Sequence, residues 1–423
     1  MTPLGGRRLL AAVALIALVL APATLLASAG PRASIPPPTP VPPNGRLSSF
    51  PRVLNTPADP IPAPDLAADG ALLADLDTGS ILYERAAGTP RPIASVTKIM
   101  TALLVLERTR PTDVVTVAPE AVFARDDYGA GSTLGLRAGE RLRVEDLLYG
   151  LVLGSANDAA VALAIHVSGS VRAFVADMNE LAQGLGMGRT TFASPHGLDD
   201  DGVSTPRDLL RLARAAASDP SFAAIAASRF HTIPSPRGPD RRIQNRNALL
   251  WLYPGTTGMK TGFTQKAGAC LVATAGRDGR RLVAIVLHAD DEAFSDAAAL
   301  LQHGFEGFVK TVLVRAGEEQ GSVRVRGGRV PAVAGATLER LVPAAQVGDV
   351  WTDIRVDPRA AFPPVPGERI GTVLLRLGER SIGRVPLLAG LPPAPLPLEG
   401  RWWTRAFEAI VRAGGDAVRG LAT

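Results

Sequence analysis

Strand-like patterns stand at both ends of one long stretch of this chain, and helical patterns lie between them. At the first end, Asp77-Thr78-Gly79-Ser80 separates two apolar runs within residues 71–85, which predicts a β-hairpin. At the other end, the turn residues Arg277-Asp278-Gly279 separate two further strand-like runs. Strands at both ends with helices between them predict one α/β (α+β) domain of about 240 residues with a mostly antiparallel sheet.

The helical patterns place apolar residues on one side of each predicted helix. They cover residues 96–107, 144–153, 159–167, 171–185 and 206–216, and another lies near 294–305. From residue 312 to residue 388 the pattern changes to short β-type runs separated by glycine and proline. This change predicts a small all-β C-terminal domain.

The composition is that of a globular protein and argues against nucleic-acid binding. Of the 423 residues, 46% are hydrophobic and 20% are charged, as in an ordinary globular protein. The net charge of +5 is too small to predict nucleic-acid binding, although it suits an anionic membrane surface or cell wall. The single cysteine, Cys270, excludes an intramolecular disulfide, and its apolar neighbours predict a buried strand residue.

The first 65 residues predict an exported protein. Arg7 and Arg8 precede an uncharged stretch that ends in Ala27-Ser28-Ala29, which is typical of a signal peptide over residues 1–29. The alternative is an uncleaved membrane anchor. Residues 30–65 are rich in proline and predict a stiff linker. Both interpretations place the rest of the chain outside the cytoplasm.

Residues 398–423 predict an amphipathic helix. On a helical wheel Arg405 and Arg412 lie on one side, and Trp402, Trp403 and Phe407 lie on the other. This pattern predicts a helix in the membrane interface, which would hold the chain at the outer face of the cytoplasmic membrane. The alternative is a terminal helix that packs on its own protein.

Ser95 and Lys98 are the first candidates for chemistry. They stand three residues apart at the start of a predicted helix, so both side chains lie on one face. A serine hydroxyl needs a base, and a lysine can serve when burial and a neighbouring cation lower its pKa. The pair alone is weak evidence for a catalytic site, because a long chain often contains S-x-x-K by chance.

Two further triplets add polar side chains. Ser155-Ala156-Asn157 lies in a predicted loop between helices. There Ser155 would relay a proton to the leaving group, and Asn157 would hold a substrate amide or Lys98. Its alternative is a helix N-cap. Lys260-Thr261-Gly262 is predicted to begin a strand whose edge accepts a substrate backbone, with Lys260 as the cation for a carboxylate. Its alternative is an exposed turn.

Taken in order, S-x-x-K, S-x-N and K-T-G form a set shared by penicillin-binding proteins and class A β-lactamases. The chain resembles the low-molecular-mass penicillin-binding proteins, the serine-type D-alanyl-D-alanine carboxypeptidases of peptidase family S11. Further stretches that fit are I-A-S-V-T-K-I-M-T-A-L-L, S-P-H-G-L-D, N-R-N-A-L-L and G-M-K-T-G-F-T-Q-K-A-G. The resemblance implies a β-lactamase/transpeptidase-like domain over residues 66–308, with an antiparallel sheet and a helical subdomain, and a β domain over 309–395.

The resemblance also implies a reaction. Ser95 attacks the penultimate D-alanine carbonyl of a peptidoglycan stem peptide that ends in D-Ala-D-Ala, Lys98 takes the serine proton, and Ser155 protonates the departing D-alanine. Lys260 and Thr261 bind the terminal carboxylate, and β-lactams acylate Ser95 as inhibitors. The N–H groups of Ser95 and Phe263 form the oxyanion hole. The substrate-binding residues implied are Asn157, Arg246, Lys260, Thr261, Gly262 and Phe263.

Several other functions compete with this one. A class A β-lactamase needs a glutamate for deacylation, and the only one between the second and third motifs is Glu180, inside a helical pattern. A D,D-endopeptidase of the same superfamily generally lacks the C-terminal β domain. A non-catalytic peptidoglycan-binding protein would have lost residues of the three motifs, whereas all three motifs are intact in this chain. The five histidines show no close-spaced pairing, so neither a metal nor a cofactor is expected.

Overall fold

The computed structural model describes residues 61–123, 132–235, 239–289, 292–360 and 363–390. The predicted signal peptide over 1–29, the predicted linker up to residue 60 and the predicted amphipathic helix over 398–423 lie outside the described residues. Their boundaries, like the other domain boundaries inferred from sequence, stay predictions.

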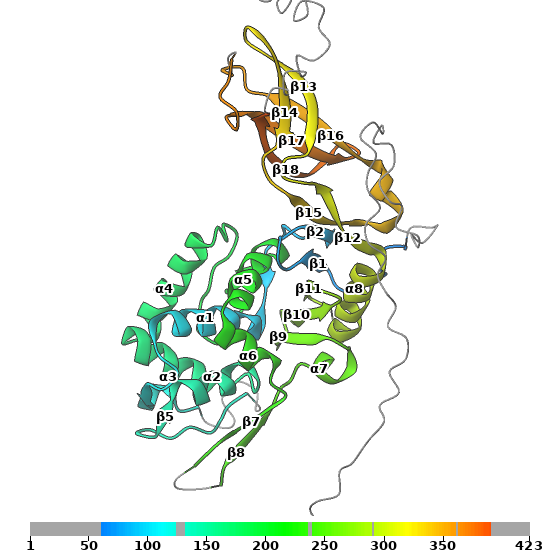
Figure 1. Cartoon of the computed structure of the whole chain (residues 1–423). Coiled ribbons are helices and arrows are strands. Elements are labelled where there is room, and N and C mark those ends of the chain that lie inside the picture. The colour runs from blue at the N-terminus through cyan, green and yellow to red at the C-terminus, as the bar shows by residue number, and fades with distance from the viewer. Residues whose placement is uncertain (1–60, 124–131, 236–238, 290–291, 361–362, 391–423) are drawn as a thin grey trace, which may run out of the picture. The chain divides into compact units, whose positions relative to one another are not determined.

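The central sheet of the N-terminal part is five-stranded and antiparallel, in the order β2-β1-β11-β10-β9 (Figure 1). Its strands are β1 (Gly70–Asp75), β2 (Ile81–Arg85), β9 (Thr256–Thr264), β10 (Gly268–Arg277) and β11 (Arg280–Leu287). The register pairs Gly70 with Leu287, so the two ends of the domain meet inside one sheet. The predicted antiparallel sheet and both of its turns are confirmed.

Both faces of this sheet are buried, because successive residues of a strand point to opposite sides. In β1, Leu72 and Ala74 belong to one core cluster, and Ala71 and Leu73 belong to the other. Helix α5 (Pro206–Ser218) covers the first face and α8 (Ala293–Gly307) covers the second, as Figure 1 shows. The sheet is therefore the middle layer between two helical layers.

A helical subdomain lies beside the first face of the sheet (Figure 1). It consists of α1 (Lys98–Arg108), α2 (Val144–Val152), α3 (Asn157–Ser168), α4 (Val171–Gly184) and α6 (Pro220–Ala227). Local capping explains several boundaries: α3 ends before Gly169 at φ +76°, and the Ser170 side chain accepts the Ala173 N–H at the start of α4. Every helix predicted within the described residues is present, and α6 is an additional helix that the sequence patterns do not predict.

Short elements join these layers. They are η1 (Ala94–Thr97), η2 (Pro119–Ala121), α7 (Leu249–Leu252), β3 (Arg91–Pro92), β4 (Val114–Thr116), β5 (Arg141–Arg143), β6 (Val203–Ser204), β7 (Phe230–Ile233) and β8 (Arg241–Gln244). One sequence prediction is wrong in detail here. The helix expected over 96–107 starts with the 3₁₀ turn η1, so the α-helix itself begins at Lys98.

The C-terminal part is a β-sheet domain, as predicted. Its five-stranded sheet runs β13-β14-β18-β17-β16, and β12 pairs with β15. A separate apolar cluster, which includes Ile370, Val373, Leu375 and Leu387, forms its core. The strands are β12 (Phe308–Val314), β13 (Glu319–Val325), β14 (Gly328–Ala334), β15 (Leu338–Pro343), β16 (Val350–Val356), β17 (Arg369–Leu377) and β18 (Arg380–Ala389), with the 3₁₀ helix η3 (Ala344–Asp349) between β15 and β16.

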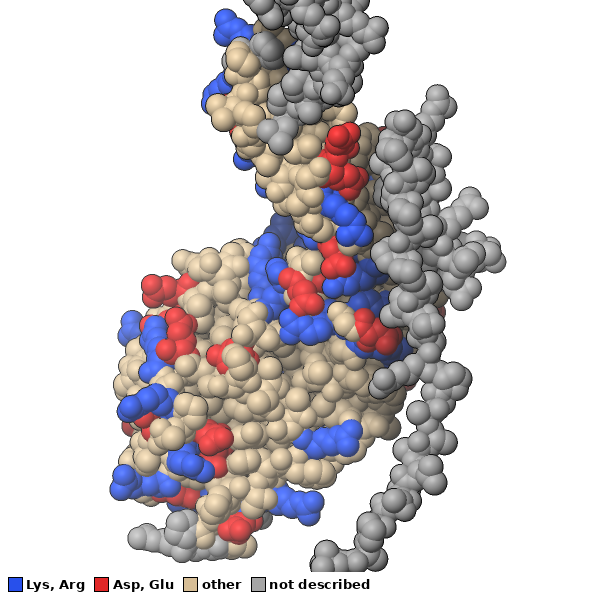
Figure 2. Space-filling model, viewed as in Figure 1, with Lys and Arg blue, Asp and Glu red and all other residues tan. Residues whose placement is uncertain are grey.

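The surface carries mixed charge. Figure 2 shows basic and acidic side chains interspersed on the viewed face. Arg207 pairs with Glu84 and Arg281 pairs with Asp77. Within the described ranges, no single helix has the length and apolar character to cross a membrane, although α3 and α4 together, bent by 84°, meet the length and composition limits.

Candidate active site

Ser95 and Lys98 meet at the start of α1. Ser95 lies in the 3₁₀ turn η1, and Lys98 is the first residue of the helix. Lys98 Nζ lies 2.8 Å from Ser95 Oγ. Lys98 has no exposed surface, and Ser95 is 8% exposed. The predicted spacing therefore brings the two side chains into direct hydrogen-bond contact.

The surroundings of Lys98 favour its neutral form. Its Nζ also donates to Asn157 Oδ1 at 2.8 Å and to the His196 carbonyl at 2.6 Å. Burial lowers the pKa of Lys98 well below its ordinary value, and the nearby cations Lys260 and Arg246 lower it further. A neutral amine has two N–H groups and one lone pair. Two N–H groups directed at Asn157 and His196 leave the lone pair facing the Ser95 hydroxyl.

Ser155 and Asn157 lie at the junction of α2 and α3. Ser155 is 3% exposed and has a φ of +60°, a conformation that costs a non-glycine residue on the order of 1–3 kcal/mol. Asn157 is the first residue of α3, and its side chain reaches Lys98. The N-cap interpretation is wrong for both, because Ala156 occupies the cap and no side chain caps the helix.

Lys260-Thr261-Gly262 lies in the middle of β9 and not at its start, which corrects the sequence prediction. The exposed-turn alternative is wrong as well, because Lys260 is 1% exposed. Its Nζ donates to the Thr261 carbonyl at 2.9 Å. Burial, followed by the charge of Arg246, lowers the pKa of Lys260 to about 7. Among the strands of the described residues, β9 is the last in the sheet order, so a peptide can pair with its outer edge.

One pocket of about 840 Å³ connects these elements. Of the predicted site residues, it is lined by Ser95, Ser155, Asn157, Arg246, Thr261, Gly262 and Phe263. Lys98 and Lys260 are buried beside it. Phe263 is 57% exposed at the pocket rim. The structure thus brings all nine sequence-predicted site residues together.

Sequence reasoning missed three features of the pocket. First, the His196 carbonyl accepts a hydrogen bond from Lys98 Nζ. Second, Ser132 lines the pocket, and its Oγ accepts a hydrogen bond from Arg246 Nη1 at 3.2 Å. Third, Asp158 is a buried carboxylate behind Ser132. In the sequence, His196 stands within S-P-H-G-L-D, a stretch that fits the family but does not indicate that its backbone carbonyl contacts Lys98. Burial lowers the pKa of its ring to about 4, so the imidazole is neutral and the carbonyl is the group that contacts the site.

Cys270 lies in β10 opposite Gly262 and is 2% exposed, which confirms the buried-strand prediction. It lines the pocket, but burial raises the pKa of its thiol to about 11. A protonated thiol is a poor nucleophile. Among the described residues, no group of three His, Cys, Asp or Glu side chains could hold a metal ion.

Comparison with known proteins gives consistent matches. Residues 56–291 match the family described as D-alanyl-D-alanine carboxypeptidase. The chain is 34% identical over 343 residues to the D-alanyl-D-alanine carboxypeptidase DacC of Escherichia coli, covering 78% of this chain and 84% of that protein. It is 29% identical over 334 residues to DacF of Bacillus subtilis, covering 76% and 85%. Penicillin binding protein 5 of Haemophilus influenzae superposes with a TM-score of 0.66 and 29% identity, covering 78% of this chain and 98% of that one.

Proposed function

The chain belongs to the D-alanyl-D-alanine carboxypeptidase family, and we propose that it removes the terminal D-alanine from peptidoglycan stem peptides through an acyl-enzyme on Ser95. The observation that carries this proposal is the 2.8 Å contact between Ser95 Oγ and the fully buried amine of Lys98. A lysine whose pKa is lowered can act as a general base near neutral pH.

Acylation begins when neutral Lys98 accepts the Ser95 proton and Oγ bonds to the carbonyl carbon of the penultimate D-alanine. The carbonyl oxygen becomes an oxyanion, which the N–H groups of Ser95 and Phe263 stabilise. The C–N bond then breaks, and Ser155 passes a proton to the departing amine. Water hydrolyses the resulting ester, which releases the shortened peptide as a carboxylate and restores the serine hydroxyl.

Substrate recognition follows from the pocket walls. The extended end of the stem peptide adds to the outer edge of β9, and its terminal carboxylate meets Lys260, Thr261 and Arg246. Asn157 holds both Lys98 and the substrate amide. A β-lactam presents a carboxylate and a strained amide in the same arrangement, so it acylates Ser95 as an inhibitor.

The pocket lining distinguishes this activity from a β-lactamase. Glu180 is exposed on α4 and does not line the pocket. Among the described lining residues there is no carboxylate to activate a deacylating water. We therefore expect a long-lived penicilloyl-enzyme. A D,D-endopeptidase is the second candidate, because it would use the same residues on a cross-linked peptide.

The first experiment tests chemistry and specificity together. The full-length protein is incubated with a fluorescent penicillin, and the modified peptide is identified by mass spectrometry. D-alanine release is then measured from a peptide ending in D-Ala-D-Ala and from a cross-linked muropeptide. We expect one label on the peptide that contains Ser95 and release from the linear peptide. A label elsewhere, rapid loss of the label, or cleavage of the cross-link alone would each contradict the proposal.

We further propose that the protein is exported and bound to the outer face of the cytoplasmic membrane by residues 398–423. The sequence pattern of tryptophans and arginines supports this placement.

In a chain that begins at residue 30, replacing Trp402, Trp403 and Phe407 by serine is expected to weaken binding to anionic liposomes by about tenfold or more. Cosedimentation measures the binding. The matched control replaces Trp351, which is 48% exposed in β16, by serine. Equal binding by all three proteins would exclude the tail as the anchor.

A further inference from the structure

Asp158 is a buried carboxylate, 1% exposed, that follows Asn157 in α3. Its oxygens accept the Leu134 N–H at 3.0 and 2.9 Å, the Leu136 N–H at 3.1 Å and the Ala159 N–H at 2.8 Å. Both oxygens therefore act as acceptors, which is the hydrogen-bonding pattern of an ionised carboxylate. A charge this deeply buried is retained only where its partners hold it in place.

The backbone that Asp158 binds, at Leu134 and Leu136, belongs to a segment over residues 132–136 that reaches the active-site pocket at Ser132. Ser132 lines the pocket. Its carbonyl accepts the Asn157 N–H at 2.6 Å, and its Oγ accepts from Arg246 Nη1 at 3.2 Å. The segment thus supports one residue that contacts Lys98 and one residue proposed to bind the substrate carboxylate.

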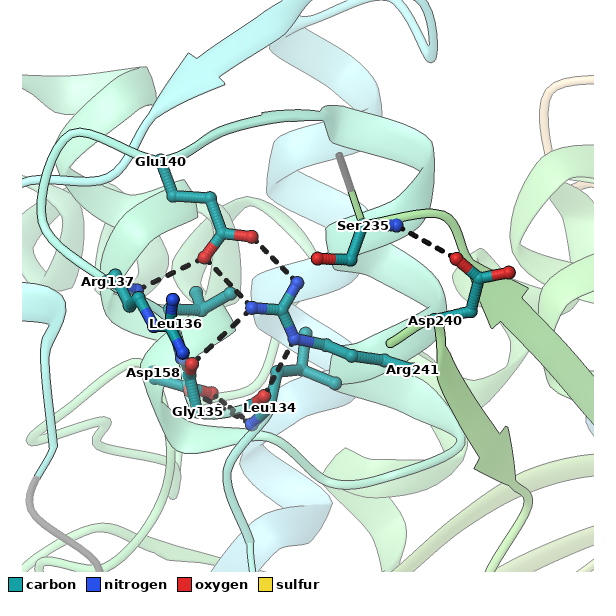
Figure 3. A network of polar contacts seen from close by, with 9 residues as sticks. All are labelled: Leu134, Gly135, Leu136, Arg137, Glu140, Asp158, Ser235, Asp240 and Arg241. Atoms are coloured by element: carbon teal, nitrogen blue, oxygen red, sulfur yellow. Dashed lines mark hydrogen bonds and ion pairs between the residues drawn. The ribbon is translucent and has the colours of Figure 1, made fainter. Parts of the chain in front are cut away.

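A second side chain fixes the same segment from outside. Arg241, at the start of β8, donates from Nε to the Leu134 carbonyl at 2.9 Å and forms an ion pair with Glu140 at 2.7 Å (Figure 3). Glu140 in turn accepts the Arg137 N–H at 3.2 Å. Figure 3 shows Asp158 and Arg241 on either side of the Leu134–Leu136 backbone. The segment is therefore clamped between α3 and β8.

Asp158 also affects Lys98 through its charge. Around Lys98, burial and the cations Lys260 and Arg246 lower its pKa, whereas the negative charge of Asp158 raises it. His196, which also borders Lys98, is neutral because its pKa is lowered to about 4. Among the described residues, Asp158 is the carboxylate whose charge opposes this lowering of the Lys98 pKa.

We propose that Asp158 is a positioning residue of the active site, which fixes residues 132–136 against Asn157 and Arg246 and sets a negative charge near Lys98. This inference rests on the proposed acylation of Ser95. It assigns to Asp158 two separable effects, one on the geometry of the pocket wall and one on the basicity of Lys98.

Three variants separate these effects. Asp158→Asn keeps the size of the side chain but removes the charge and turns one acceptor into a donor. Arg241→Gln weakens the clamp and leaves the Asp158 charge in place. Asp296→Asn is the matched control, since Asp296 is also buried and its two oxygens accept the N–H groups of Ala67 and Ala68. For each folded variant, the second-order rate constant of penicillin acylation is measured from pH 5 to 10, a range chosen to bracket a lowered lysine pKa.

We expect Asp158→Asn to reduce acylation by about 10- to 100-fold, because buried N–H donors lose their acceptor. Its rise of rate with pH should also move to lower pH, because removal of a nearby anion lowers the pKa of the base. Arg241→Gln should slow acylation by about three- to tenfold with the pH of the rise unchanged. Asp296→Asn should keep the wild-type rate and pH profile.

Wild-type rates in both Asp158→Asn and Arg241→Gln would overturn the clamp. A slow Asp158→Asn with the wild-type pH profile, or a shift of equal size in Asp296→Asn, would overturn the charge effect. If Asp158→Asn does not fold cooperatively, Arg241→Gln with a wild-type rate overturns the inference by itself. Absence of acylation in the wild-type protein would instead reject the proposed function, so the two failures are distinguishable.

Discussion

Replacing Lys98 by methionine is expected to slow penicillin acylation of Ser95 by about 10²- to 10⁴-fold, the usual contribution of general-base catalysis. Methionine fills a similar volume but offers no lone pair for the Ser95 proton, which the wild-type amine receives across 2.8 Å. In the wild type, acylation should rise with pH as Lys98 loses its proton. Because burial lowers that pKa well below its ordinary value, the rise should lie well below pH 10.5. The variant should lose this rise.

Two further proteins complete the measurement. Lys98→Arg keeps a cation but cannot supply a neutral base, so its rate should be as low as that of Lys98→Met. Lys310→Met removes an exposed lysine in β12 that pairs with Glu339, and it should acylate at the wild-type rate. A Lys98→Met protein that retains more than about a tenth of the wild-type rate would show that another group is the base.

The parts of the fold that sequence predicts are those set by local patterns. The hairpin around Asp77-Thr78-Gly79-Ser80 and the turn around Arg277-Asp278-Gly279 join apolar runs whose pairing needs no other information. The start of strand β9 is harder to predict from the sequence. Its residues Thr256–Thr264 include two glycines and a lysine, so no apolar alternation marks where the strand begins. Pairing with β10 determines its length.

The candidate site also combines residues that the sequence predicts with contacts that only the fold determines. Ser95, Lys98, Ser155 and Lys260 can be proposed from the sequence because their residue types stand in three motifs with a characteristic order. The carbonyl of His196 was missed because every residue has a carbonyl, and only the fold decides which one meets Lys98. The role of Asp158 cannot be predicted from the sequence for a related reason. Its partners at Leu134 and Leu136 are backbone N–H groups about 24 residues away, and a backbone N–H places no requirement on the type of side chain at its position.

Gly262→Ala is expected to reduce acylation of Ser95 by about 100-fold or more and to destabilise the fold by about 1–3 kcal/mol, as overpacking does. A Cβ at this position would lie 2.9 Å from the Ile93 carbonyl oxygen and 3.0 Å from the Ser95 nitrogen. These are backbone atoms of the turn that presents the nucleophile, so they cannot rotate away as a side chain would. Strand β9 and η1 must separate, which displaces the Ser95 N–H from the proposed oxyanion hole.

Gly276→Ala in the neighbouring strand is the matched control. There the nearest atom to an added Cβ is the Arg280 carbonyl oxygen at 3.8 Å, an ordinary contact, and Gly276 does not line the pocket. Its acylation rate should stay within about twofold of the wild type, because the added methyl group meets no close backbone atom and lies away from the pocket, and substitutions without such strain usually have small effects. Both rates are measured with fluorescent penicillin on proteins whose thermal unfolding is recorded in parallel. Wild-type acylation by Gly262→Ala would mean that β9 does not hold the Ser95 turn, and that the glycine of the third motif serves another purpose.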